Sequence, residues 1–161
     1  MDKNLQILAE KYKQILEQQV EPEMVVNSHR TKRWYLNGKL HRTDGPAIER
    51  ADGSKEWWVN GEIHRTDGPA LEDADGTKRW VLNNKSHRTD GPAVEYPDGS
   101  KVWHLNGKLH RTDGPAIEDS DGYKEWWVNG KELTEDQFND YLATLKEIEK
   151  GSKEAGANLD F

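Results

Sequence analysis

Apolar and polar residues alternate with a period of two through the middle of the chain. A tryptophan recurs every 23 residues, and the position two residues after it is always Leu or Val. The five recurring tryptophans are Trp34, Trp57, Trp80, Trp103 and Trp126. Because successive side chains of a β-strand point to opposite faces of a sheet, this spacing predicts short strands with Trp and Leu or Val on one face.

Pairs of turn-forming residues separate these strands. Asn-Gly or Asn-Asn follows each of the five tryptophans, and Asp-Gly precedes all but the first. Asn, Asp and Gly tolerate the positive φ of tight two-residue hairpin turns. A turn at residues 52–53 would place Ile48 opposite Trp57, and a turn at residues 60–61 would place Trp57 opposite His64. We therefore expect three short strands that form a meander in every unit.

This register divides the sheet into an invariant face and a variable face. Besides the Trp and Leu or Val positions, the invariant face would carry four apolar residues of the paired strands: Ile48, Leu71, Val94 and Ile117. We expect this face to be the core. The first row of the variable face reads Tyr35, Trp58, Val81, His104 and Trp127. The second row reads Arg33, Glu56, Arg79, Val102 and Glu125.

Both ends of the chain show helical periodicity instead. Residues 3–19 and 135–149 each carry an apolar stripe at a spacing of three and four residues. Thr134 and Gln137 have capping-box spacing, and Gly151 is a typical helix stop. We predict a capping helix in 1–23, a β-hairpin repeat array in 24–133, a helix in 134–150 and a disordered tail in 151–161.

A seven-residue run, HRTDGPA, occurs four times at the same interval of 23 residues, starting at His41, His64, His87 and His110. A strict period of this length is typical of stacked repeats, in which each unit buries its apolar surface against its neighbours. The predicted fold is mainly β: an elongated antiparallel β-hairpin array of about five 23-residue units, with an α-helix at each end.

Charge and composition narrow the classes of function. The net charge is −7, and most of it lies in the two ends, so the array is nearly neutral. The Lys and Arg surplus required to bind nucleic acid or an anionic membrane is missing. The chain contains no Cys, which excludes disulfides and thiolate metal sites. No secretory signal or membrane-spanning apolar run is evident, so we expect a cytoplasmic protein.

The repeated His, Arg and Asp side chains resemble acid–base or phosphoryl-transfer groups. However, a catalytic site needs convergent, asymmetric groups, and four identical copies favour a structural network. We therefore predict that the chain is not an enzyme. As an alternative, the repeated side chains form a ladder that holds a nucleotide or another phosphorylated ligand, although adjacent Asp residues would neutralise much of its charge. The ladder consists of His41, Arg42, His64, Arg65, His87, Arg88, His110 and Arg111.

No metal or cofactor is expected. Residues 73–76 and 119–122 resemble the start of a calcium loop, but they lack its later ligands and its terminal bidentate Glu. An Asp-Gly hairpin turn explains both segments more simply.

The variable face supplies the candidate contact residues for a protein partner. Trp and Tyr are favoured anchors of protein interfaces. The candidates are Tyr35, Trp58, His104 and Trp127. The other interpretation is that the terminal helices pack on this same face, and the sequence leaves both open.

The frame W-x-x-N-G-K-x-H-R-x-D-G-P-A-x-E-x-x-D-G, over about residues 24–132, resembles tandem repeats of tailed phages, giant viruses and some bacteria. These repeats are similar to a variant of the MORN repeat. The chain departs from the frame at Arg30, which replaces a turn Gly, and at Leu133 and Thr134, which replace His-Arg. The resemblance implies a non-catalytic scaffold, and its phage-type members imply a small protein that binds a host or competitor factor.

The leading hypothesis is therefore a non-enzymatic protein-binding module, such as a viral inhibitor or adaptor acting on a host protein. The alternatives are a sequestering binder of a phosphorylated ligand and a structural component that assembles as a homo-oligomer through sheet edges or helix stripes.

Overall fold

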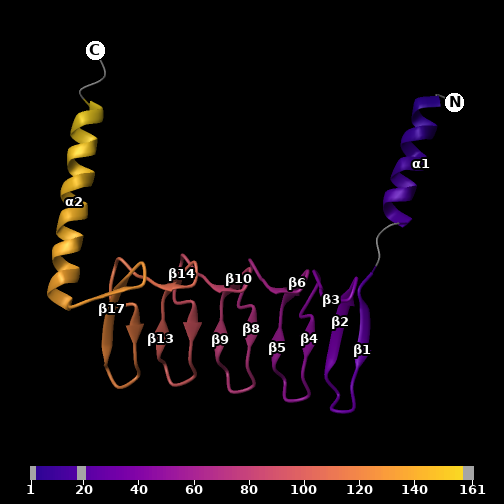
Figure 1. Ribbon diagram of the computed structural model, residues 1–161, viewed down its shortest axis with the longest axis horizontal. Coiled ribbons are helices and arrows are strands. Elements are labelled where there is room, and N and C mark those ends of the chain that lie inside the picture. The colour runs from indigo at the N-terminus through magenta and orange to yellow at the C-terminus, as the bar shows by residue number, and fades with distance from the viewer. Residues whose placement is uncertain (1–2, 18–20, 158–161) are drawn as a thin grey trace.

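The computed structural model describes residues 3–17 and 21–157. Figure 1 shows an elongated row of antiparallel hairpins with a helix at each end. The helices are α1 (Lys3–Glu17) and α2 (Glu135–Ala157). The expected fold, a β-hairpin array flanked by two helices, is confirmed.

Each unit contributes two hairpins. The first, which we call the sheet hairpin, lies in one long antiparallel sheet. The sheet hairpins are β1 (Glu23–Val26) with β2 (Lys32–Leu36), β4 (Ile48–Glu49) with β5 (Lys55–Glu56), β8 (Leu71–Glu72) with β9 (Lys78–Arg79), β12 (Val94–Glu95) with β13 (Lys101–Val102), and β16 (Ile117–Glu118) with β17 (Lys124–Val128).

The second hairpin of each unit, which we call the side hairpin, follows directly along the chain. The side hairpins are β2 with β3 (Lys39–Leu40), β6 (Trp58–Val59) with β7 (Glu62–Ile63), β10 (Val81–Leu82) with β11 (Lys85–Ser86), β14 (His104–Leu105) with β15 (Lys108–Leu109), and β17 with β18 (Lys131–Leu133).

The side hairpins have the turn that the sequence predicts. Asn60 and Gly61 adopt φ of 54° and 84°, as a two-residue turn of the type I′ class requires. The N–H of His64 donates to the carbonyl oxygen of Trp57 at 3.0 Å, so these two residues face each other as expected. The expectation of one three-stranded meander in every unit holds only for the first and last units, β1-β2-β3 and β16-β17-β18. In the three central units the side hairpin forms its own two-stranded sheet, because the chain leaves the long sheet at the tryptophan.

The sheet hairpins differ from the prediction in their register. Ile48 pairs with Glu56, and not with Trp57. The loop contains three residues, 51–53, and the N–H of Arg50 donates to the carbonyl oxygen of Ser54 at 2.9 Å. Asp52 accepts the N–H of Ser54 at 2.9 Å, and this side-chain bond stabilises the longer loop.

This change of one residue moves a whole set of side chains to the other face. Ile48, Leu71, Val94 and Ile117 lie in the row of Arg33, Glu56, Arg79, Val102 and Glu125, so their assignment to the tryptophan face is wrong. The tryptophans lie opposite alanines instead, and the N–H of Trp57 donates to the carbonyl oxygen of Ala70 at 2.8 Å. The alanines are 0% exposed at all four positions: Ala47, Ala70, Ala93 and Ala116.

Helix α2 begins as the sequence predicts and ends later. Thr134 N–H donates to Gln137 Oε1 at 3.0 Å and Gln137 N–H to Thr134 Oγ1 at 3.2 Å, which completes the capping box. Phe138 is 3% exposed, and the helix contacts β17 and β18. Gly151 is not a stop, because it lacks the positive φ of a C-terminal glycine cap and the helix continues to Ala157. The remainder of the predicted tail, residues 158–161, lies outside the described residues.

Helix α1 does not cap the array in the way that the sequence suggests. The N-terminal edge of the long sheet is β1, and Figure 1 shows α1 standing apart from it. The apolar side chains described in the first part of α1 face solvent, with Leu5 62%, Leu8 53% and Tyr12 60% exposed.

The continuation of α2 through Gly151 predicts the effect of a substitution. Gly151→Ala should raise the free energy of unfolding by about 0.5–1 kcal/mol and increase helicity, because Ala is the better former of helix interiors. A Cβ at residue 151 would meet no atom within 4 Å, so no clash offsets the gain. Far-ultraviolet circular dichroism and urea unfolding measure both quantities. A helix that ended at Gly151 would show a loss of stability instead.

Candidate functional site

The arginine of each HRTDGPA run stacks on the tryptophan of its own unit. The guanidinium carbon of Arg42 lies 4.1 Å from the ring centre of Trp34. The corresponding distances for Arg65, Arg88 and Arg111 are 4.0, 3.9 and 3.8 Å. These arginine side chains are only 20%, 21%, 20% and 18% exposed in chain order, so the cation–π contact is largely shielded from water.

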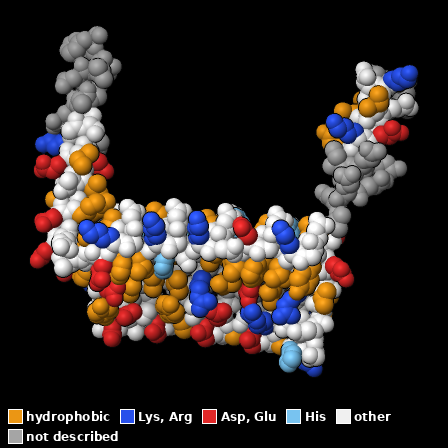
Figure 2. Space-filling view, in the orientation of Figure 1, with side chains coloured by type: hydrophobic (Ala, Val, Ile, Leu, Met, Phe, Trp, Pro, Cys, Tyr) orange, Lys and Arg blue, Asp and Glu red, His pale blue; other side chains and the backbone are white. Residues whose placement is uncertain are grey.

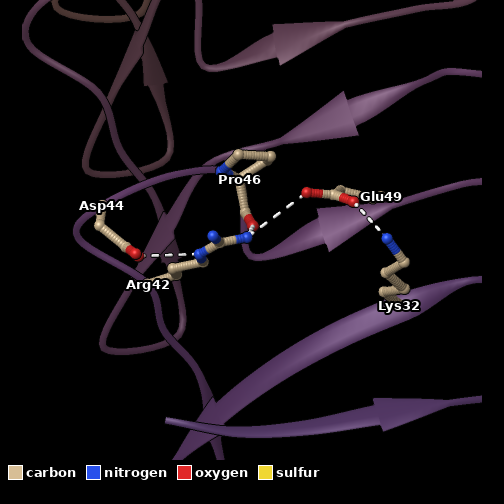
Figure 3. Close-up of polar contacts among 5 residues, drawn as sticks. All are labelled: Lys32, Arg42, Asp44, Pro46 and Glu49. Atoms are coloured by element: carbon tan, nitrogen blue, oxygen red, sulfur yellow. Dashed lines mark hydrogen bonds and ion pairs between the residues drawn. The ribbon is translucent and has the colours of Figure 1, made fainter. Parts of the chain in front are cut away.

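Hydrogen bonds hold each guanidinium in place. Figure 3 shows that Arg42 donates from Nε to Asp44 Oδ1 at 2.8 Å and from Nη1 to the carbonyl oxygen of Pro46 at 3.2 Å. Its Nη1 also lies 3.4 Å from Glu49 Oε1, and Lys32 Nζ donates to the other oxygen of Glu49 at 3.2 Å. The other three runs repeat the contacts of the arginine with Asp, Pro and Glu.

The glycine of each run is required by this stack. A Cβ on Gly45 would lie 3.0 Å from Cζ of Arg42, and a Cβ on Gly68 would lie 2.9 Å from Cζ of Arg65. The guanidinium is therefore confined between the indole ring on one side and the glycine on the other. The role of this glycine is therefore close packing.

A ladder of alternating charges, which the sequence reasoning missed, runs along the same face as the tryptophans. Each residue of the ladder is the cross-strand neighbour of the next: Lys32, Glu49, Lys55, Glu72, Lys78, Glu95, Lys101, Glu118 and Lys124. Opposite charges in direct cross-strand pairs are favourable. The regular placement of Lys and Glu in each unit could have revealed the ladder, but only with the correct register.

The histidine and the arginine backbone of each run connect one unit to the next. The N–H of Asn60 donates to His41 Nδ1 at 3.1 Å, and the N–H of Arg42 donates to the carbonyl oxygen of Trp58 at 3.0 Å. The other three runs repeat this contact. Nδ1 lies close to the first turn residue of the following side hairpin in each pair: His64 with Asn83, His87 with Asn106, and His110 with Asn129. The four runs are thus joints between units.

The eight residues of the alternative ligand ladder therefore have protein partners already. The hydrogen bond and charge of Arg42 lower the pKa of Asp44, and the pKa of Asp67 and Asp90 is lowered in the same way by Arg65 and Arg88. An incoming phosphate would have to compete with these carboxylates for each guanidinium.

The candidate partner-binding residues lie together on the other face of the strands. Trp58 donates from Nε1 to Glu56 Oε2 at 2.8 Å, and Trp127 to Glu125 Oε2 at 2.7 Å, which orients both indoles. We call the set the variable row. It comprises Tyr35, Trp58, Val81, His104 and Trp127. Val81 is 6% exposed and the other four side chains are half-buried.

His104 is the polar exception in the variable row. Its Nδ1 is buried and has no hydrogen-bond partner within the described residues. Burial lowers the pKa of the imidazole, because desolvation disfavours its charged form.

The two helices leave the middle of the array open. Figure 2 shows a band of hydrophobic side chains across one face, between charged groups above and below it. Helix α2 contacts the last hairpin, and α1 lies apart from the sheet. The interpretation in which both helices pack over the variable row is therefore not supported by this arrangement.

Two properties of the described residues bear on other kinds of site. They contain no group of three or more His, Cys, Asp or Glu side chains that could hold a metal ion. None of the helices in the described part of the chain is long and apolar enough to cross a membrane.

A scan against protein-family models finds no match for the sequence, and a search of curated proteins finds none either. The resemblance to phage-type repeats accordingly stays a prediction.

The confined guanidinium predicts a coupling between two positions. Gly91→Ala should lower the free energy of unfolding by about 1–3 kcal/mol, because its Cβ would lie 3.0 Å from Cζ of Arg88. In an Arg88→Ala background the same change should cost little. Urea unfolding of the four proteins of this double-mutant cycle measures the coupling. An equal cost in both backgrounds would show that Arg88 does not require the glycine.

The unpartnered imidazole predicts a pH-dependent gain. His104→Val should raise the free energy of unfolding by about 1 kcal/mol at pH 7.5, because it removes a buried polar atom without a partner. An unfolded histidine takes up its proton near pH 6.5. Folded His104 resists protonation, so the wild type loses stability as the pH falls below that value and the advantage of the variant grows.

Urea unfolding at pH 7.5, 6.5 and 5.5 measures this effect. The control is His29→Val, a change at an exposed histidine of the first turn. A His104→Val advantage that stays constant across the three pH values would contradict the assignment of the pH dependence to His104.

Proposed function

We propose that this chain is a non-enzymatic repeat module that binds a protein partner through the variable row. The observation that carries the proposal is a row of mostly aromatic and apolar, half-buried side chains that differ between units and lie on a face that the two helices leave uncovered. Among the described residues, α2 has its main contacts with the C-terminal hairpin, and α1 stands away from the sheet.

The distribution of roles between the two faces supports this proposal. The invariant His, Arg, Asp and Gly side chains are used to join the units, which leaves no convergent catalytic group among them. Individual side chains, by contrast, distinguish one unit from another along the variable row. Trp and Tyr are common anchors of protein interfaces, and Glu56 and Glu125 hold the two indoles in fixed orientations.

The kind of partner follows from the predicted family. Resemblance to repeats of tailed phages and giant viruses favours a host protein as the partner and an inhibitor or adaptor as the role. The host cytoplasm is the corresponding location.

A second candidate function, self-assembly, is favoured by the N-terminal edge of the sheet. In the part of the chain that the structure describes, strand β1 pairs with β2 alone, and its residues Met24, Val25 and Val26 are 51%, 47% and 52% exposed. An unpaired apolar edge is a template for strand addition. Sedimentation of the pure protein over a wide concentration range distinguishes this candidate from the binding module.

The binding module predicts a loss of capture in one variant. Immobilised wild-type protein should retain a protein from bacterial lysate in stoichiometric amount. The folded Trp58→Ser/Trp127→Ser variant should retain at least about thirtyfold less, because loss of a central aromatic anchor costs about 2 kcal/mol or more. Circular dichroism and thermal melting establish that the variant is folded.

Tyr96→Ser is the matched control, since Tyr96 is a 41% exposed aromatic residue of a sheet-hairpin turn and lies outside the variable row. It should retain the partner fully. Equal capture by the wild type and the folded double variant would refute the variable row as the binding surface.

A further inference from the structure

The face opposite to the variable row carries a series of equivalent pockets. One lies between each pair of successive HRTDGPA runs, and in chain order their volumes are about 430, 500 and 620 Å³. Each is lined by Arg, Thr, Asp and Gly of one run and by His, Arg, Thr and Asp of the next. Neighbouring pockets share the Arg-Thr-Asp segment between them.

Every pocket has an aromatic and aliphatic floor and an acidic rim. In the first pocket the floor contains Trp57 and Val59, and the rim contains Asp44 and Asp67. The rim carboxylates are 80% and 79% exposed, and each uses Oδ1 to bind its own arginine. This combination is suited to a ligand that brings a compact apolar group and a cation together.

The spacing of the pockets restricts the ligand further. Each unit adds two strands to the long sheet, so with about 4.8 Å between strands the pockets repeat every ~9.6 Å. A polyproline II helix repeats every three residues, or about 9.3 Å. A β-strand presents the same face every ~6.8 Å, and an α-helical heptad measures about 10.5 Å. Over the two intervals between three pockets, the repeat of a polyproline II helix departs from the pocket spacing by only ~0.6 Å in total. The α-helical heptad departs from it by about 1.8 Å.

We propose that these pockets form a groove for a proline-rich peptide in the polyproline II conformation that carries a basic residue at every third position. One proline of each turn lies on the tryptophan floor, and the basic side chain of that turn pairs with a rim aspartate. Aromatic-lined grooves are a general means of binding such helices. The groove is on the opposite side of the strands from the variable row, so it is independent of the proposed function.

Peptides of defined length and period test the proposal. The probe is (Pro-Pro-Arg)n, titrated into the full chain while tryptophan fluorescence and heat of binding are recorded. The three-turn peptide should bind at least about tenfold more tightly than the one-turn peptide. Once one turn is bound, the next turn is held at a high effective concentration near the next pocket. Two peptides of equal charge serve as controls: one with the same composition and clustered arginines, and one with Gly-Ser in place of Pro-Pro.

A pair of matched variants locates the binding. Asp67→Asn removes a rim charge shared by two pockets and keeps an oxygen that accepts the Nε bond of Arg65. It should weaken binding of the three-turn peptide about fivefold or more, because it removes the carboxylate charge that faces the basic side chains of the peptide in two pockets. Glu62→Gln removes the same charge at an exposed side-hairpin residue outside the pockets and should change the affinity less than about twofold.

Several outcomes would overturn the groove. They are equal affinity for the period-broken or Gly-Ser peptides, equal effects of Asp67→Asn and Glu62→Gln, or no binding of the three-turn peptide at millimolar concentration. Binding of a neutral β-linked glycan chain in place of the peptide would overturn it as well.

Discussion

The confined guanidinium of each HRTDGPA run is the interaction on which the rest of the array depends. The arginine lies between an indole ring and a glycine, and its nitrogens bind Asp, Pro and Glu. With the arginine fixed, the loop around it is fixed too, and the backbone N–H of that arginine reaches the next side hairpin. One arginine per unit, through its side chain and its backbone N–H, therefore connects the long sheet, the side hairpins and the neighbouring unit.

The same constraint separates scaffold from contact surface. Residues that repeat without change hold each unit together and join it to the next. The residues that differ from unit to unit include the variable row, which lies on the face of the strands opposite to the repeated tryptophans. In the last unit Leu133 and Thr134 replace His-Arg, and helix α2 contacts strands β17 and β18. A thin protein with few fully buried large side chains thus gains its order from repeated polar contacts as much as from a core.

Local signals predicted local structure well. The Asn-Gly turns, the positive φ of Arg30 at the turn-glycine position and the capping box of α2 all depend on a few adjacent residues. Signals that require distant partners were less informative. Gly151 suggested a stop, but a single glycine costs only about 1 kcal/mol within a helix and the helix continues through it. The position of each arginine between a tryptophan and a glycine cannot be read from the run itself, because these neighbours meet only in space.

The sequence by itself determined the repeat, the number of units, the side-hairpin turns and the presence of two terminal helices, since each of these is set by periodicity or by turn chemistry. Only the tertiary structure decided which residues share a face. The side-chain period of a strand is two, so one extra loop residue, stabilised by Asp52, moved Ile48 away from the tryptophans and placed alanines beside them. Whether a helix covers the sheet was likewise decided in space, because an amphipathic stripe specifies an apolar face and not the surface that meets it.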